Sequence, residues 1–207
     1  NENISPDIYT MNSFIDYYCK SGEMKKAEEW FHQMKEFNIK PNITTYNSLM
    51  NGYFKNKIVK KAEEFYEEMI KNHIMPDVIT FTIFIDGYLK NEEIEKAEKT
   101  FSKMLEYNIE PNIKTINSMI NGYCKLGKMK KAESIFNEMI NLNIKPNIIT
   151  FSSLINGYCK SGKMKKAENF FKEMKFYKIK PNVVLFTTLI DGYCKSGNLS
   201  KALKTYE

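Results

Sequence analysis

Residues that could do chemistry recur in this sequence every 35 residues, and we call each set of equivalent positions a column. The first lysine column holds Lys20, Lys55, Lys90, Lys125, Lys160 and Lys195. The small polar column holds Asn12, Asn47, Thr82, Asn117, Ser152 and Thr187. The Asn/Asp column holds Asp7, Asn42, Asp77, Asn112, Asn147 and Asn182. Because polar side chains hydrogen-bond to base edges and lysines attract phosphates, these columns suggest a surface that reads one base per repeat.

Simpler roles exist for two of these columns. A lysine at the end of a helix interacts with the helix dipole, and Asn or Asp can cap a helix start. The helix dipole, however, predicts a basic residue anywhere in the last turn, whereas lysine occupies the same place in all six repeats. Capping by the Asn/Asp column does not explain why the small polar column varies among Asn, Ser and Thr. A second lysine column, expected to be solvated among glutamates, holds Lys26, Lys61, Lys96, Lys131, Lys166 and Lys201.

Other chemistry-bearing residues favour structural roles. The cysteine column contains Cys19, Cys124, Cys159 and Cys194 but also Phe54 and Leu89, so it predicts buried apolar groups. Without a CxxC pair or a Cys/His cluster we expect no metal site. Residues 122–128 and 157–163 nearly match a phosphate-binding loop, but Met replaces the required Ser or Thr and a helix precedes each. We therefore predict no catalytic residue, no cofactor and no small-molecule substrate.

The elements that position these columns follow from the spacing of proline. The six prolines, Pro6, Pro41, Pro76, Pro111, Pro146 and Pro181, are 35 residues apart, and so are the six alanines. Such a period is typical of a solenoid. We frame the repeats as 8–42, 43–77, 78–112, 113–147, 148–182 and 183–207. The last is incomplete and residues 1–7 resemble the tail of a preceding repeat, so we expect part of a longer array.

Each repeat is predicted to contain two helices. Residues 148–160 and 163–177 each show apolar residues at helical spacing, and Ser161 and Gly162 break the pattern between them. Alanine and methionine columns in the second helix are expected to form the core. Lys57 and Glu92 replace the turn glycine in the second and third repeats, so those turns are expected to differ. The fold class is therefore all-α, built from stacked helix hairpins.

The period, the closing run Ile39-Lys40-Pro41-Asn42 and the run from Thr45 to Tyr53 closely resemble pentatricopeptide repeats of the pure 35-residue class. The resemblance implies a right-handed α-solenoid, a superhelix of helix-turn-helix repeats. It also implies binding of single-stranded RNA, one nucleotide per repeat, with the N-terminal repeat toward the RNA 5′ end. An organelle such as the mitochondrion is the implied location, within an intracellular setting that buried free thiols also fit.

In that family the small polar residue and the following Asn or Asp select the base together. By resemblance, Asn12 with Asn42 and Asn117 with Asn147 read C or U, and Asn47 with Asp77 reads U. Thr82 with Asn112 and Ser152 with Asn182 read A, while Thr187 indicates a purine. The implied target is 5′-(C/U)UA(C/U)A(purine)-3′.

The resemblance assigns roles to two further columns. Bases would stack between residues at the second place of successive repeats, which are Tyr9, Thr44, Ile79, Lys114, Ile149 and Val184. Thr44 and Lys114 depart from the usual aliphatic type. The first lysine column would contact the RNA phosphates.

The composition and net charge of the chain are compatible with an RNA-binding array. The chain has 207 residues, an apolar fraction of 43% and a formal net charge of +6, which permits an anionic partner. No apolar run is long enough for a membrane helix. We predict a non-enzymatic RNA-binding array that serves RNA processing, stability or translation. A protein-binding scaffold of the tetratricopeptide type and an RNA-processing enzyme with its catalytic domain after residue 207 stay open as alternatives.

Overall fold

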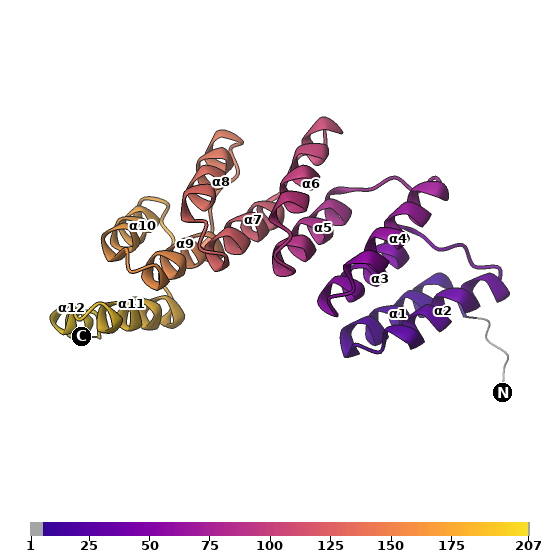
Figure 1. Ribbon diagram of the computed structural model, residues 1–207, viewed down its shortest axis with the longest axis horizontal. Coiled ribbons are helices and arrows are strands. Elements are labelled where there is room, and N and C mark those ends of the chain that lie inside the picture. Colours follow the sequence, from indigo (N-terminus) through magenta and orange to yellow (C-terminus); the bar gives the residue numbers. More distant parts are fainter. Residues whose placement is uncertain (1–5, 207) are drawn as a thin grey trace. The chain divides into compact units, whose positions relative to one another are not determined.

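The computed structural model describes residues 6–206, and the regular elements among them are all α-helices. The predicted all-α class is therefore confirmed, whereas most of the predicted tail 1–7 lies outside the described residues. In chain order the helices are α1 (Ile8–Ser21), α2 (Met24–Glu36), α3 (Ile43–Lys55), α4 (Val59–Lys71), α5 (Val78–Lys90), α6 (Ile94–Glu106), α7 (Ile113–Lys125), α8 (Met129–Asn141), α9 (Ile148–Lys160), α10 (Met164–Phe176), α11 (Val183–Lys195) and α12 (Leu199–Tyr206). They form successive hairpins (Figure 1).

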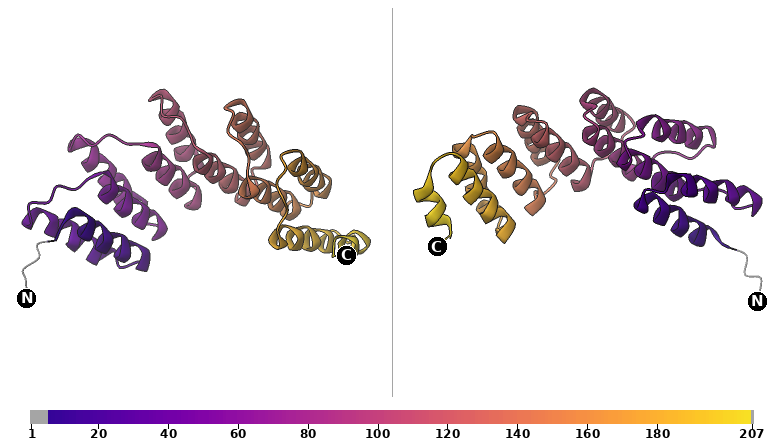
Figure 2. Two further views of the ribbon diagram at one scale, coloured as in Figure 1. Left: turned by 180° about the vertical axis from the view of Figure 1, so that it is seen from behind. Right: turned by 60° about the horizontal axis from the view of Figure 1, so that its bottom comes forward.

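The described residues form two compact units, which divide between residues 110 and 111. In the first unit α1, α3 and α5 stack side by side, and α2, α4 and α6 each pack on the first helix of their own hairpin (Figures 1 and 2). In the second unit α7, α9 and α11 form the stack, with α8, α10 and α12 packed on it in the same way. The first helices of each unit therefore carry the small polar and first lysine columns side by side.

The turn inside each hairpin has one conformation throughout the described chain. The turn residue at the end of the first helix is left-handed, with φ between +68° and +83° at Gly22, Gly127, Gly162 and Gly197. Lys57 and Glu92 adopt the same conformation, at φ +61° and +64°, so the expectation that their turns differ is wrong. A side chain costs about 1 kcal/mol in this region, which is small beside the packing that joins the two helices.

The core columns are buried as predicted. The methionine column (Met34, Met69, Met104, Met139 and Met174) and the alanine column are fully or almost fully buried. Cys19, Cys124 and Cys159 are also buried, and burial raises the pKa of Cys124 to about 12, so this thiol is protonated and inert. Cys194 is exposed, against the expectation for its column. It lies on α11, and within the described residues no first helix of a following repeat packs on α11.

Glycine in the middle of a first helix allows successive first helices to approach closely. A Cβ atom on Gly87 would lie 2.3 Å from Cγ of Phe54 in the preceding first helix, and one on Gly157 would lie 3.0 Å from Cβ of Cys124 in the preceding first helix. Both glycines sit inside α-helices, with no strand before them, so the near-match of residues 157–163 to a phosphate-binding loop is a packing feature.

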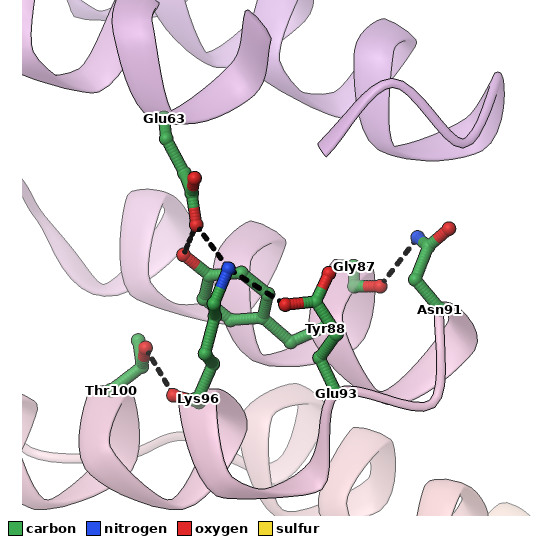
Figure 3. A network of polar contacts seen from close by, with 7 residues as sticks. All are labelled: Glu63, Gly87, Tyr88, Asn91, Glu93, Lys96 and Thr100. Atoms are coloured by element: carbon green, nitrogen blue, oxygen red, sulfur yellow. Dashed lines mark hydrogen bonds and ion pairs between the residues drawn. The ribbon is translucent and has the colours of Figure 1, made fainter. Parts of the chain in front are cut away.

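A polar cluster of Tyr, Glu and Lys joins neighbouring repeats on the side of the second helices (Figure 3). Tyr88 donates its hydroxyl proton to Oε1 of Glu63 at 2.8 Å, and Nζ of Lys96 lies 2.9 Å from the same oxygen. Lys96 also pairs with Glu93 at 2.7 Å. Burial would raise the pKa of Glu63, but the hydrogen bonds from Lys96 and Tyr88 outweigh it and hold the pKa below its usual value.

Other members of the second lysine column form the same contact between repeats. Lys166 pairs with Glu133 at 2.8 Å, and Lys201 pairs with Glu168 at 2.6 Å. These lysines remain about half exposed, yet each bridges two repeats. The exposure of Lys96, Lys166 and Lys201 agrees with the expectation of a solvated column, and their pairing across repeats adds a role that the sequence did not indicate.

Tyr53 and Tyr88 occupy the same place in consecutive repeats and provide a matched test of this cluster. Tyr88→Phe should lower the free energy of unfolding by about 1.5 kcal/mol, because Glu63 loses a hydrogen bond in a partly buried place. The Tyr53 hydroxyl is buried with no hydrogen-bond partner among the described residues. Tyr53→Phe should therefore be neutral or stabilise by up to about 1 kcal/mol. Urea denaturation followed by circular dichroism measures both, and equal losses in the two variants would contradict the proposed role of the cluster.

Candidate nucleic-acid interface

Every residue of the Asn/Asp column caps the first helix of a repeat. The side-chain oxygen accepts a hydrogen bond from the backbone N–H three residues later, at 2.8 Å in Asp7, 3.1 Å in Asn42 and 2.8 Å in Asp77. The same bond measures 3.0 Å at Asn112, 3.1 Å at Asn147 and 2.9 Å at Asn182. One oxygen of each side chain is thus committed to the helix, and the other polar atom, Nδ2 or Oδ2, remains for other contacts.

The small polar residue of one repeat lies beside the cap of the next. Nδ2 of Asn12 is 3.4 Å from Oδ1 of Asn42, and Nδ2 of Asn117 is 3.2 Å from Oδ1 of Asn147. These pairs are 30 residues apart in sequence, so the stacking of first helices brings them together. The structure therefore juxtaposes two of the side-chain pairs that the resemblance assigns to base selection.

The remaining members of the small polar column use other contacts. Asn47 and Asp77 are linked through Thr80, whose hydroxyl lies 2.9 Å from Oδ1 of Asn47 and 3.0 Å from Oδ1 of Asp77. Thr82 and Thr187 donate their hydroxyl protons to backbone carbonyls of their own helices, at 2.7 and 2.9 Å. Their hydroxyl oxygens therefore act as acceptors toward any further partner.

Threonine at the third place of the first helices belongs to this network, and our reading of the sequence overlooked it. Thr45, Thr80 and Thr150 are fully buried, and their hydroxyls lie 2.7 to 2.9 Å from Oδ1 of the small polar residue in the preceding repeat. The available signal was a threonine column with the same period: Thr10, Thr45, Thr80, Thr115 and Thr150. Only Leu185 departs from it.

The predicted stacking residues are exposed in all six repeats. Tyr9 is 78% exposed, Ile79 52%, Ile149 56% and Val184 67%, values that are high for apolar side chains. Thr44 and Lys114 are exposed at equivalent places. Each of these residues follows its cap by two positions, so an apolar surface adjoins most of the polar pairs.

The first lysine column ends the first helices, and its charges are not equivalent. Lys20, Lys90 and Lys195 pair with the aspartate four residues earlier, at 2.5, 2.5 and 2.6 Å. Lys55, Lys125 and Lys160 follow asparagine instead and form no salt bridge within residues 6–206. In three of the six repeats the lysine charge is therefore partly neutralised by an aspartate of the same helix.

The described residues offer little for other chemistry. No group of three or more His, Cys, Asp or Glu among them is arranged to hold a metal ion. Nor does any described helix combine the length and apolar character needed to span a bilayer. The recurring polar pairs and the exposed residues beside them are a regular surface feature of both units.

Comparison with known proteins matches this pattern to a repeat family. A model described as the PPR repeat family matches residues 6–53, 41–90, 76–125, 112–160 and 149–184. A second, described as PPR repeat, matches residues 178–207. A search of curated proteins finds no match.

Solved structures show the same architecture. The pentatricopeptide repeat protein PPR10 from maize is 25% identical with a TM-score of 0.80, over 99% of this chain and 29% of that one. PPR10 in complex with an 18-nt psaJ RNA element is 24% identical with a TM-score of 0.84, over 95% and 29%. The PPR domain of Arabidopsis thaliana protein-only RNase P 1 in complex with tRNA is 16% identical with a TM-score of 0.70, over 91% and 98%. This chain thus spans under a third of PPR10, and the predicted α-solenoid of helical repeats is confirmed.

Proposed function

This chain belongs to the PPR repeat family, and from that membership we propose that it binds single-stranded RNA, one nucleotide per repeat, and acts by binding alone. The observation that carries the proposal is the pairing of a small polar side chain with the cap of the next repeat, as in Asn117 with Asn147. RNA-bound and tRNA-bound relatives of the same fold support it. We extend it to processing, stability or translation of an organellar RNA.

The polar atoms left over after capping explain which base each pair would prefer. In Asn47 with Asp77, the amide offers a donor, because Thr80 occupies its oxygen, and the second carboxylate oxygen offers an acceptor. Uracil has a carbonyl acceptor next to its N3–H donor, so one donor and one acceptor match it. Recognition of an unstacked base through this edge is the usual mode for single-stranded RNA.

Asparagine in the Asn/Asp column changes this pattern. Oδ1 of Asn42 and of Asn147 caps the helix, so the free atom is the donor Nδ2. With Asn12 or Asn117 such a pair presents two donors, which suit the adjacent N3 and O2 acceptors of cytosine or the carbonyls of uracil. Within the second unit, the hydroxyl of Ser152 would present an acceptor and Nδ2 of Asn182, whose Oδ1 caps α11, a donor, as the N6 amino group and N1 of adenine require. These assignments support the proposed target 5′-(C/U)UA(C/U)A(purine)-3′.

The experiment is binding of the 207-residue chain to labelled RNA, measured by fluorescence anisotropy with CUACAA as the probe and a scrambled sequence as the control. We expect at least about tenfold tighter binding of CUACAA, since each mismatched base forfeits hydrogen bonds. Equal affinity would overturn the base assignments. No binding of either RNA would favour the protein-binding scaffold.

The salt dependence of the same binding tests the phosphate contacts. Six contacts would give a slope of log K against log salt of about −0.7 × 6 ≈ −4, and three would give about −2. Because Lys20, Lys90 and Lys195 are already paired with aspartates, we expect about −2. Asp86→Asn should make the slope steeper by freeing Lys90.

A further inference from the structure

Thr45 and Thr150 occupy identical settings in two repeats of different units. Each hydroxyl lies 2.7 Å from Oδ1 of the small polar residue in the preceding repeat, Asn12 or Asn117. Each also accepts a hydrogen bond from the backbone N–H of the cap residue, at 3.1 Å from Asn42 and 3.2 Å from Asn147. Two chemically equal triads thus recur along the chain.

The hydroxyl proton in each triad has one favourable acceptor. The alternative, Oδ1 of the cap residue, is farther away, at 3.1 Å from Thr45 and 3.2 Å from Thr150. That oxygen also already accepts a backbone N–H. The proton therefore points to Oδ1 of Asn12 or Asn117, where the contact is short and lies in partly buried surroundings at Asn12 and buried surroundings at Asn117.

This contact determines which end of the amide faces outward. With Oδ1 held by the threonine, Nδ2 donates one hydrogen to the cap oxygen and keeps its second hydrogen for another partner. A flipped amide of Asn117 would set Oδ1 against Oδ1 of Asn147, which are two acceptors with no proton between them. The threonine therefore holds the amide in its donor orientation.

Capping itself does not require the hydroxyl. Leu185 occupies the threonine place in α11, and Asn182 still accepts its backbone N–H at 2.9 Å. The helix starts with the same cap when the hydroxyl is missing. The recurrence of threonine elsewhere is thus better explained by its contact with the preceding repeat.

We infer that Thr45 and Thr150 are positioning residues for base recognition: each fixes the amide of Asn12 or Asn117 as a donor, so a residue of the next repeat sets the preference for a pyrimidine. The inference rests on the proposed RNA binding. Under this inference one base is recognised through three side chains instead of two: the small polar residue, the cap residue and the threonine that holds the amide.

The test measures discrimination at two bases of one RNA. CUACAA is compared with AUACAA, altered at the base assigned to Asn12, and with CUAAAA, altered at the base assigned to Asn117. Thr150→Val should reduce discrimination between C and A at the fourth base about tenfold and leave discrimination at the first base unchanged. Thr45→Val should do the reverse. Thr150→Ser, which keeps the hydroxyl, should restore the preference.

Controls separate this role from stability and from the proposed function. Thr10→Val removes a hydroxyl that donates a hydrogen bond to the cap residue Asp7 but contacts no base-selecting amide in the described residues, and it should leave both ratios unchanged. If Thr150→Val weakened binding of all RNAs equally, or left the ratio unaltered while the unchanged protein discriminates, the inference would be wrong. If the unchanged protein discriminates at neither base, the proposed function fails instead. If Thr150→Val does not fold, Thr45→Val tests the same inference through discrimination at the first base.

Discussion

Gly87→Ala is expected to lower the free energy of unfolding by about 3 kcal/mol or more, the range of severe overpacking in a core. The new Cβ would lie 2.3 Å from the Phe54 ring. That ring cannot turn aside, because it packs edge-on against Phe84 and Tyr88 at 5.0 and 5.3 Å between centroids. Two first helices would have to separate. Thermal and urea denaturation followed by circular dichroism measure the loss.

The control for this substitution is Gly162→Ala. Gly162 has φ +70° and no atom within 4 Å of an added Cβ, so only the left-handed backbone opposes alanine, at a cost of about 1 kcal/mol. A double variant, Phe54→Ala with Gly87→Ala, should lose less stability than the sum of the single losses, because the clash needs both side chains. Additive losses would show that the close approach of α3 and α5 is not responsible.

Asn47→Thr is expected to change the base preferred at the second position from U to G. A threonine there would donate its proton to its own helix, as Thr82 does at 2.7 Å, and so offer an acceptor beside the free oxygen of Asp77. Guanine has two adjacent donors, N1–H and the N2 amino group, that match two acceptors. The ratio of affinities for CUACAA and CGACAA should shift by about 2 kcal/mol, or roughly 30-fold.

The same substitution in another repeat supplies the matched control. Asn117→Thr places the hydroxyl beside Asn147, whose free atom is the donor Nδ2. One acceptor and one donor match adenine, so CUAAAA should then bind more tightly than CUACAA. If both variants preferred the same purine, the cap residue would have no part in base selection, and if Asn47→Thr still preferred U, the repeat frame would be wrong.

Most of the fold could be predicted because its determinants repeat at one period. Proline, alanine and glycine columns set the hairpins, and the Asn/Asp column marked the start of the first helix in every repeat, each of which the structure caps. The turns at Lys57 and Glu92 were the exception. There, helix packing imposes the left-handed conformation, and it outweighs the modest preference for glycine that guided the expectation.

Contacts that join different repeats were less predictable, both in the packing of the second helices and at the candidate site. The pairing of Lys96 with Glu63 spans 33 residues, and composition alone suggested only a solvated face. The threonine hydroxyls recurred visibly, but their acceptors could be identified only once the first helices were stacked. The pairs of lysine with aspartate, such as Asp16 with Lys20, were readable at a spacing of four. The place four residues before the lysine, however, holds aspartate in three repeats and asparagine in the other three, which hid the pairs.

The capping side chains place a restriction on how this array can change its preferences during evolution or design. Residues such as Asn147 start a helix with one atom and would present the other to a base. A replacement must therefore be short enough to cap, which leaves Asn, Asp, Ser and Thr and disfavours the long side chains that usually recognise guanine. A new base preference must therefore be built from these four residue types, one repeat at a time. Each substitution at the cap position affects the stability of the helix as well as base recognition.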